Sequence, residues 1–314
     1  MQAVVIATGE LHLEERADPV PGDTEVLVSV RAAGLNGADI LQRAGRYPPP
    51  PGVPADVPGL EMAGEVAAAG AKVRAAAVGD RVMAVVAGGG QATMAVVDES
   101  HLLPVPASVS WEAAGGFPEA FSTAYDALFP RGRLSMGDRL LVTGAAGGVG
   151  VAAVQLGAAA GAHVVASVRD AARRGEVGAL GAHEVIGPDD VADHGPYDVV
   201  LELVGAASLP QALRALALEA RVVVIGVGSG SRIELDALTL MAARATLGGA
   251  TLRTRSRAEK AAVAAGVRAH VLPLISQGTV GVPVCATFPI TEAPAAYERF
   301  TAGAKLGKVV LVTR

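Results

Sequence analysis

Three glycines spaced three residues apart are the part of the sequence whose residue types point most directly to chemistry. They follow the apolar run LLVT (residues 140–143) and precede an alanine-rich stretch of helical character. Glycines there allow a sharp turn, a close approach of the backbone to phosphate, and tight packing of the helix on the strand. The positive end of that helix then faces an anion. We therefore expect a dinucleotide pyrophosphate to contact Gly144, Ala146, Gly147, Gly148, Val149 and Gly150.

Two other interpretations of this segment need an answer. The glycines also fit a tight turn in an ordinary strand–turn–helix unit. Residues 140–168 carry no Asp, Glu, Lys or Arg and are long enough to cross a bilayer. Their six glycines, the internal His163 and the strand-like HVVASV at the end favour a soluble βαβ unit over a membrane span.

The residues after the second strand indicate which nicotinamide cofactor would bind. An NAD site places an acid about 20 residues past the glycines, to bind the ribose hydroxyls. That position falls near Ser167, where no acid occurs, and Arg169 and Arg173 follow. Guanidinium groups pair well with phosphate oxygens, so this charge favours NADPH. The alternative is that the arginines are a solvated helix turn and that Asp170 binds the ribose.

Composition limits the possible classes of protein. The chain has 314 residues, of which 51% are hydrophobic but only 3% aromatic, which favours α/β layers built from Val, Ala and Leu. With a net charge of −5 and no runs of basic residues, the sequence predicts no basic surface that would attract nucleic acid or an anionic membrane. Acidic residues near the N-terminus argue against a signal peptide, so we expect a cytoplasmic protein. With Cys285 alone and six scattered histidines, we expect no metal site.

The pattern along the chain predicts two domains. Up to about residue 110, short alternating runs separated by Pro and Gly predict an antiparallel β-rich domain. Residues 111–128 have a helical pattern, after which strands and helices alternate as in a doubly wound parallel sheet. We expect the first domain to cover residues 1–120, completed by 252–314, and the cofactor domain to cover 121–251.

With these segments laid out, the chain resembles the zinc-free quinone oxidoreductases, related to zeta-crystallin, of the medium-chain dehydrogenase/reductase superfamily. The resemblance runs over essentially the whole chain. It is carried by AAGLNGADILQRAGRYPPPPG, PGLEMAGEV, VGDRVMAV, FPEAFSTAYDAL, TGAAGGVG and the terminal GKVVLV. It implies an α/β protein with a GroES-like β-barrel catalytic domain and a Rossmann-type cofactor domain.

The zinc alcohol dehydrogenases of this superfamily bind metal through a cysteine after AAG and a histidine before the glutamate of the second segment. This chain has Asn36 and Leu60 there, and it lacks the cysteine cluster of the structural zinc lobe. The resemblance therefore implies hydride chemistry without a metal.

The resemblance also implies roles for single residues. Asn36 and Tyr47 match positions on the substrate side of the active site, and Thr123 matches a residue close to the nicotinamide. Each also has a simpler reading, as a turn former, a loop anchor and a helix residue respectively. Gly226 and Val227 are either turn residues or backbone near the nicotinamide. Arg253, in TLRTRSR, matches a stretch of this branch or faces solvent.

The function expected from these residues is NADPH-dependent hydride transfer to a quinone or a similar electron-poor acceptor. Positioning would supply most of the catalysis, with Asn36 or Tyr47 binding a developing oxyanion. One alternative is an enoyl reductase acting on an α,β-unsaturated ketone or thioester, which requires protonation at carbon. Another is a non-catalytic NADPH-binding protein. A homodimer formed through the edge of the cofactor sheet is implied by the resemblance alone.

Overall fold

The computed structural model describes residues 1–313, and the chain divides into two compact units. The first unit comprises residues 1–122, 252–303 and 308 onward, and the second comprises 123–251 and 304–307. Within residues 1–313, no helix is long and apolar enough to cross a membrane.

The first unit is built on a mostly antiparallel sheet of seven strands in the order β14-β15-β3-β4-β5-β7, with β6 paired to β3. Valine-rich alternation in β3 buries every second residue, as a half-buried strand requires. A separate hairpin joins β1 and β2. The strands are β1 (Gln2–Ala7), β2 (Glu10–Glu15), β3 (Glu25–Gly34), β4 (Glu61–Ala69), β5 (Arg81–Val85), β6 (Met94–Asp98), β7 (Leu103–Pro104), β14 (Val284–Pro289) and β15 (Lys308–Val312).

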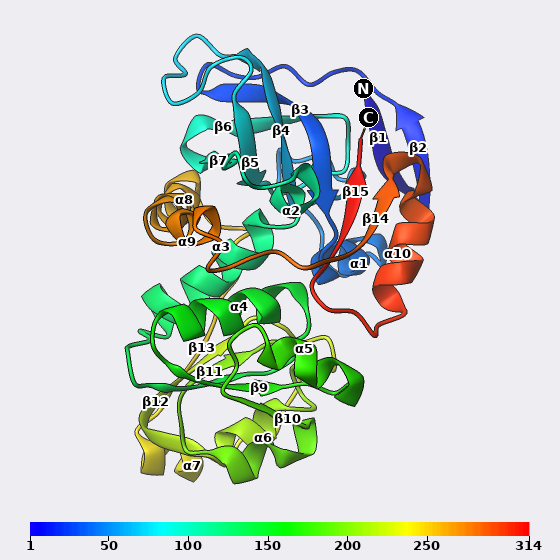
Figure 1. The fold of residues 1–314 in the computed structure, drawn as a ribbon. Coiled ribbons are helices and arrows are strands. Elements are labelled where there is room, and N and C mark those ends of the chain that lie inside the picture. Colours follow the sequence, from blue (N-terminus) through cyan, green and yellow to red (C-terminus); the bar gives the residue numbers. More distant parts are fainter. Residues whose placement is uncertain (314) are drawn as a thin grey trace. The chain divides into compact units, whose positions relative to one another are not determined.

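Strand β15 comes from the end of the chain and lies between β14 and β3 (Figure 1). It is parallel to β14 and antiparallel to β3. Val309 and Leu311 of this strand are buried in one cluster with Leu35 and Tyr297, so β15 belongs to the core of the first unit.

The helices of the first unit are shorter than the sequence pattern predicts. Residues 111–128 form two helices because Pro118, which lacks an N–H, begins the second. The helix that ends at His270 is followed by a short helix whose second residue is Pro273. The helices are α1 (Gly37–Arg43), α2 (Trp111–Gly115), α3 (Pro118–Asp126), α8 (Arg257–His270), α9 (Leu272–Ser276) and α10 (Ala293–Thr301), with 3-10 turns η1 (Glu99–His101) and η5 (Ile290–Glu292); α3 continues into the second unit.

The second unit contains a six-stranded parallel sheet in the order β10-β9-β8-β11-β12-β13. Numbered from β8, this is 3-2-1-4-5-6, the order of dinucleotide-binding sheets, and it confirms the expected doubly wound fold. Its strands are β8 (Arg139–Val142), β9 (His163–Ser167), β10 (Glu184–Ile186), β11 (Tyr197–Glu202), β12 (Leu216–Val224) and β13 (Thr246–Gly249).

Helices connect these parallel strands, as crossover connections require. The longest is α4, whose small apolar side chains are almost all buried, because it packs on the central strands (Figure 1). The helices of this unit are α4 (Gly148–Ala159), α5 (Arg174–Gly178), α6 (Leu209–Leu213) and α7 (Ala237–Ala243), with the π-helix η2 (Ala127–Arg131) and 3-10 turns η3 (Ala171–Arg173) and η4 (Pro188–His194).

Candidate active site

A buried ion pair lies at the centre of the first unit. The Nζ of Lys308 and the Oε1 of Glu61 are 2.6 Å apart, and both side chains are almost fully buried. Lys308 Nζ also donates to the carbonyl oxygen of Leu35 (2.8 Å) and to Oδ1 of Asn36 (2.7 Å). Glu61 accepts from Nδ2 of Asn36 through Oε1 (2.9 Å) and from the backbone N–H of Glu119 through Oε2 (2.8 Å). The pair therefore has the surrounding hydrogen bonds that a buried charge requires.

Asn36 is held in place by this ion pair. Besides its bond to Glu61, its Nδ2 approaches the carbonyl oxygen of Gly34 at 3.3 Å, and its Oδ1 accepts from Lys308. The donor and acceptor atoms of the amide are thus all engaged within the protein. Donation to a substrate oxyanion, the role expected for Asn36, would compete with these bonds and stays a prediction.

The neighbouring carboxyl group of Asp39 fixes two loops. It accepts from the backbone N–H of Asn36 (2.8 Å) and of Gly59 (3.1 Å), and it is fully buried. Burial raises the pKa of Asp39 to about 6, although these two N–H groups and the charge of Lys308 lower it. The carboxyl therefore changes charge in the weakly acidic range.

This raised pKa predicts a pH-dependent stability. The ordinary pKa of Asp39 is 3.8, so between about pH 4 and 6 the folded chain keeps a proton that the unfolded chain releases. The contribution of Asp39 to the free energy of unfolding should therefore decrease by about 2–3 kcal/mol as the pH rises through this range. Urea unfolding of the wild-type protein and of Asp39→Asn at several pH values measures the difference. Parallel curves for the two proteins would contradict the assignment.

Arg253 holds the loop that carries Tyr47. Its Nη1 donates to the Tyr47 carbonyl oxygen (2.8 Å), its Nε to that of Ala87 (2.7 Å) and its Nη2 to Oε1 of Gln42 (2.6 Å). The guanidinium also lies 5.0 Å from the centre of the Tyr47 ring. Arg253 is only 3% exposed, so the interpretation that it faces solvent is wrong. Its contact with a cofactor stays a prediction.

The hydroxyl group of Tyr47 is free to act on a ligand. No hydrogen bond joins it to any other group in the described part of the chain, although the ring is half-buried. Burial, assisted by the negative charge of Glu119, raises its pKa above the ordinary value of 10.0. Tyr47 therefore remains protonated at neutral pH and can donate a hydrogen bond.

The glycine turn of the second unit has the geometry that the sequence predicts. Gly144 follows β8 with φ +60°, which favours glycine. A Cβ on Gly150 would lie 2.6 Å from Cα of Ala145, so only glycine lets α4 approach the turn this closely. A Cβ on Gly147 would meet only the carbonyl oxygen of Gly144, at 3.4 Å, and the backbone from Ala146 to Val149 is partly exposed. The turn thus leaves room for an anion at the start of α4.

A buried carboxylate that the sequence does not reveal organises this turn. Oε1 of Glu202, at the end of β11, accepts from Oγ1 of Thr143 (2.9 Å) and from Oγ of Ser208 (2.6 Å). It also accepts from the backbone N–H groups of Val204 (2.7 Å) and Gly205 (2.8 Å). Thr143 directly precedes Gly144, so Glu202 connects the ends of the two central strands where a nucleotide would sit.

The arginines after β9 differ in their availability. Arg173 bonds to Glu176 and to the carbonyl oxygen of Ala304, whereas Arg169 is exposed and has no bonded partner among residues 1–313. Asp170 uses its side chain to cap the next turn, at Ala172. Ser167 ends the strand, and its carbonyl oxygen accepts from Ala145 (3.1 Å). Of these two arginines, Arg169 is therefore the one whose guanidinium group is free for a further ligand atom.

The remaining predicted site residues are Gly226, Val227 and Thr123. A Cβ on Gly226 would lie 2.2 Å from the carbonyl oxygen of Leu203, so close packing alone explains this glycine. Val227 is 46% exposed. Thr123 is 7% exposed and is the first residue of the second unit. Their contacts with a cofactor stay predictions.

Sequence patterns also miss the segment from Ala304 to Gly307. Gly307 pairs with Gly147 of the glycine turn, and its N–H donates to Ala146 (2.9 Å). The sequence does not suggest this contact, because residues 304–307 follow α10, a helix of the first unit. Glu61, Lys308 and Glu202 are missed for the same reason, since each acts through distant partners.

Within residues 1–313, no group of three or more His, Cys, Asp or Glu side chains is arranged to hold a metal ion. Of the two residues that the resemblance sets against metal ligands, Asn36 accepts a hydrogen bond from Lys308 through its Oδ1 and Leu60 is 3% exposed.

Two family descriptions match the chain. Residues 22–107 match the alcohol dehydrogenase GroES-like domain, and residues 148–266 match the family described as zinc-binding dehydrogenase. The expected combination of a GroES-like and a Rossmann-type domain is thereby confirmed.

Several known proteins resemble the chain over most of its length. A quinone oxidoreductase-like protein 2 homolog from Nematostella vectensis is 30% identical over 93% of this chain and 83% of its own. The quinone oxidoreductase of Mus musculus is 30% identical over 94% and 91%. Prostaglandin reductase-3 of Bos taurus is 37% identical over 68% and 58%.

Among solved structures, a mycobacterial protein complexed with NADPH superposes with a TM-score of 0.88 at 27% identity, covering 99% of this chain and 100% of its own. A thermostable alcohol dehydrogenase from Pyrobaculum aerophilum gives a TM-score of 0.86 at 27% identity, covering 99% of each chain.

Proposed function

Since the chain belongs to the quinone oxidoreductase-like proteins of the medium-chain dehydrogenase/reductase superfamily, we propose that it reduces a quinone or a similar electron-poor acceptor with NADPH, without zinc. The chain is an oxidoreductase that uses a nicotinamide cofactor, which supplies the hydride when it is bound. The observation that carries the choice of a quinone is the 30% identity to quinone oxidoreductase and quinone oxidoreductase-like proteins over 93% and 94% of this chain. The free, protonated hydroxyl of Tyr47 can donate a hydrogen bond to an acceptor oxygen in either reaction.

The residues of the chain would contribute mainly position and electrostatics. The glycine turn would receive the pyrophosphate at the start of α4. Tyr47 would donate a hydrogen bond to an acceptor oxygen as negative charge develops there. Lys308 and Glu61 hold the side-chain amide of Asn36 in one orientation, so it would not need to reorient during the reaction. Quinone reduction needs little acid catalysis, because solvent can protonate the reduced oxygens.

Arg169 supports NADPH over NADH, and its replacement tests the choice. We expect Arg169→Ala to weaken NADPH binding by about tenfold to a hundredfold, the loss expected for one charged hydrogen bond, and to leave NADH binding nearly unchanged. Titration of cofactor fluorescence measures both dissociation constants. Arg173→Ala is the comparison, because Arg173 already pairs with Glu176. Equal losses for both cofactors in Arg169→Ala would show that this residue does not bind the 2′-phosphate.

The main experiment follows NADPH oxidation at its absorbance band with a 1,4-quinone, with NADH in parallel. Fast oxidation of NADPH alone is expected. Binding of NADPH without oxidation in the presence of quinones or enones would instead support a non-catalytic NADPH-binding protein.

The similarity to a prostaglandin reductase supports a second candidate, reduction of an α,β-unsaturated carbonyl compound. Tyr47→Phe separates the two. With a quinone we expect kcat to change less than about tenfold, whereas an enone that needs Tyr47 as proton donor should lose about a hundredfold or more. Turnover of both acceptors by wild-type and variant protein measures this. A large loss with the quinone would contradict solvent protonation.

A homodimer through the cofactor sheet is also part of the proposal. Among residues 1–313, strand β13 pairs only with β12 and leaves its other edge open, which favours pairing with a second copy. Leu218, Leu238 and Met241, on β12 and α7, are each at least 60% exposed. Sedimentation velocity should give the mass of two chains, and a single-chain mass at micromolar concentration would contradict the proposal.

A further inference from the structure

Arg253 is a buried cation whose bonded partners are all neutral. It is 3% exposed, and its three hydrogen bonds go to the carbonyl oxygens of Tyr47 and Ala87 and to the side-chain oxygen of Gln42. Among residues 1–313, no carboxylate lies close enough to its guanidinium to form an ion pair. Uncharged donors could also satisfy three neutral acceptors, so these bonds do not by themselves account for a charged side chain.

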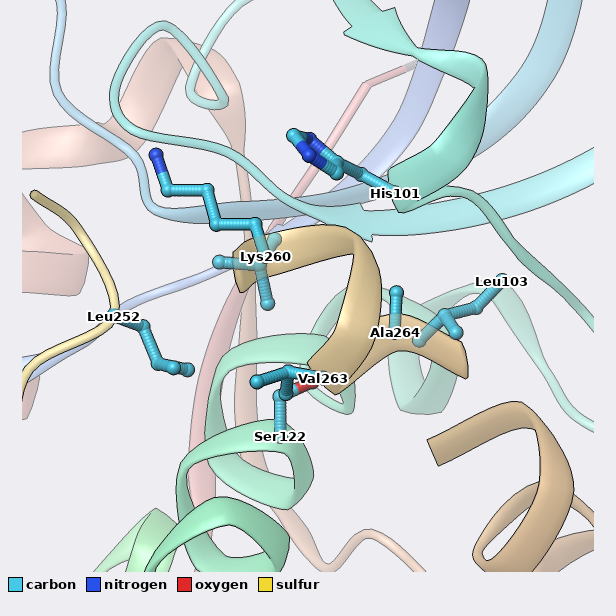
Figure 2. Close-up of a pocket in the computed structure, with 8 residues that line it drawn as sticks. His101, Leu103, Ser122, Leu252, Lys260, Val263 and Ala264 are labelled. Carbon is cyan, nitrogen blue, oxygen red and sulfur yellow. The ribbon is translucent and has the colours of Figure 1, made fainter. Parts of the chain in front are cut away.

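Close packing on both sides fixes the position of Arg253. The preceding residue, Leu252, is buried and lines a pocket against α8 that has room for about one water molecule. Figure 2 shows the Leu252 side chain extending from its loop toward Val263 of that helix. On the other side, a Cβ on Gly88 would lie 3.6 Å from Nη2 of Arg253 and 2.6 Å from Cγ1 of Val53. The guanidinium is therefore a fixed point to which a loop can be attached.

The loop attached to it is the one that carries Tyr47. Residues 44–60, between α1 and β4, form neither helix nor strand, so side-chain bonds must hold this segment in place. Arg253 bonds to the Tyr47 carbonyl oxygen near its beginning. Gln42, the partner of Arg253 in α1, also donates through its Nε2 to the carbonyl oxygen of Ala55 (3.3 Å) near its end. One guanidinium and one amide thus join both ends of the loop.

The charge of Arg253 also acts on the Tyr47 hydroxyl group. The guanidinium lies 5.0 Å from the centre of the ring. Burial raises the pKa of Tyr47, the negative charge of Glu119 adds to this effect, and the positive charge of Arg253 opposes it. A cation there favours the negative charge that grows on the phenol oxygen as it donates its proton to a hydrogen bond.

We propose that Arg253 is a positioning residue that acts through Tyr47. It holds the ring where the hydroxyl group meets an oxygen of the acceptor, and its charge strengthens that hydroxyl as a donor. The planar guanidinium suits both tasks, because it bonds to three loops in fixed directions and keeps its charge when it is buried. The inference rests on the proposed function for the acceptor, and it differs from the expected contact of Arg253 with the cofactor.

Fluorine NMR of the free protein tests the inference without cofactor or turnover. With 3-fluorotyrosine in place of the four tyrosines, each gives one signal, and Tyr47→Phe identifies the signal of Tyr47. Arg253→Lys keeps the charge but not the planar group, and it should move and broaden this signal. Arg253→Met also removes the charge, so the signal should in addition titrate at a higher pH than in the wild-type protein.

Arg268→Lys is the matched control. Arg268 belongs to the same unit and also donates to carbonyl oxygens, those of Ser100 and Leu102, but not to the Tyr47 loop. The melting temperature shows whether each variant is folded, and Gln42→Leu, which removes a single bond to Arg253, gives the same test with a smaller disturbance. An unchanged Tyr47 signal in the folded variants, or an equal change in Arg268→Lys, would overturn the inference.

A double-variant cycle with a 1,4-quinone separates this inference from the proposed function. Arg253→Lys and Tyr47→Phe should each lower kcat/KM by about threefold to tenfold, the loss expected for one hydrogen bond. The double variant should lose no more than either single one, and the dissociation constant of NADPH should not change. Losses that multiply, or weaker NADPH binding by Arg253→Lys, would overturn the inference and leave the function standing. A Tyr47 signal that depends on Arg253, without NADPH oxidation by any acceptor, would do the reverse.

Discussion

Replacing Lys308 with methionine is expected to lower the free energy of unfolding by about 3–5 kcal/mol, the largest stability effect we predict for this chain. The substitution leaves Glu61 buried without its cation, 2.6 Å from where the ammonium was. It also removes the donors to Leu35 and Asn36. Urea unfolding measures the loss, and the fluorescence of Trp111, the single tryptophan of the chain, reports on the first unit.

A double substitution shows whether the loss comes from the unpaired charge. Adding Glu61→Gln to Lys308→Met removes the carboxylate and should restore most of the lost stability, because two charges are then absent instead of one. If the double variant is less stable than Lys308→Met, the ion pair is not the cause. Lys72→Met serves as control, because Lys72 is 69% exposed and pairs with Asp23 at the surface of the same unit, and it should lie within about 0.5 kcal/mol of the wild-type protein.

Gly147→Ala is expected to weaken the binding of NADPH and of NADH alike, by about tenfold or more. The protein itself tolerates the methyl group, because its nearest neighbour would be the carbonyl oxygen of Gly144 at 3.4 Å and the backbone φ of −75° suits alanine. The added Cβ instead occupies the space through which a pyrophosphate would approach the backbone. Dissociation constants for both cofactors, together with the melting temperature, test this.

The choice of glycine matters in this experiment. Gly150→Ala would place a Cβ 2.6 Å from Cα of Ala145 and would disturb the fold. A loss of cofactor binding in that variant could not be separated from a loss of folded structure. Gly175→Ala is the matched control, since nothing lies within 4 Å of the added atom. If Gly147→Ala binds both cofactors as the wild-type protein does, the pyrophosphate does not approach this part of the turn.

The sequence predicts those features that depend on residues close together in the chain. The turn from Gly144 to Gly150 was recognisable because its strand, glycines and helix are consecutive, and its three glycines occur with the expected geometry. The alternation of apolar runs was enough to predict the doubly wound sheet. The helical pattern after Trp111 does not show where its first helix ends, because the pattern continues through Pro118, which begins a second helix.

The sequence reveals little about the groups that fix the candidate active site. Lys308 and Asn36 are 272 positions apart, and Arg253 and Gln42 are 211 apart. No local pattern distinguishes these side chains from surface residues, since burial and partner are decided only when distant strands meet. The same reason explains why Arg253 was open to a solvent-facing interpretation, although three of its nitrogen atoms are bonded inside the first unit.

The position of β15 between β14 and β3 has a consequence for the order in which the chain can fold during synthesis. The second unit is nearly continuous, from residue 123 to 251, and has all six of its strands before β14 is made. The sheet of the first unit is incomplete until the last described strand is available, although β3 ends at Gly34, about 270 residues before β15 begins at Lys308. During synthesis on the ribosome, the second unit should therefore fold before the first. Until β15 is made, the sheet of the N-terminal strands has an open edge, which nascent-chain chaperones would need to protect.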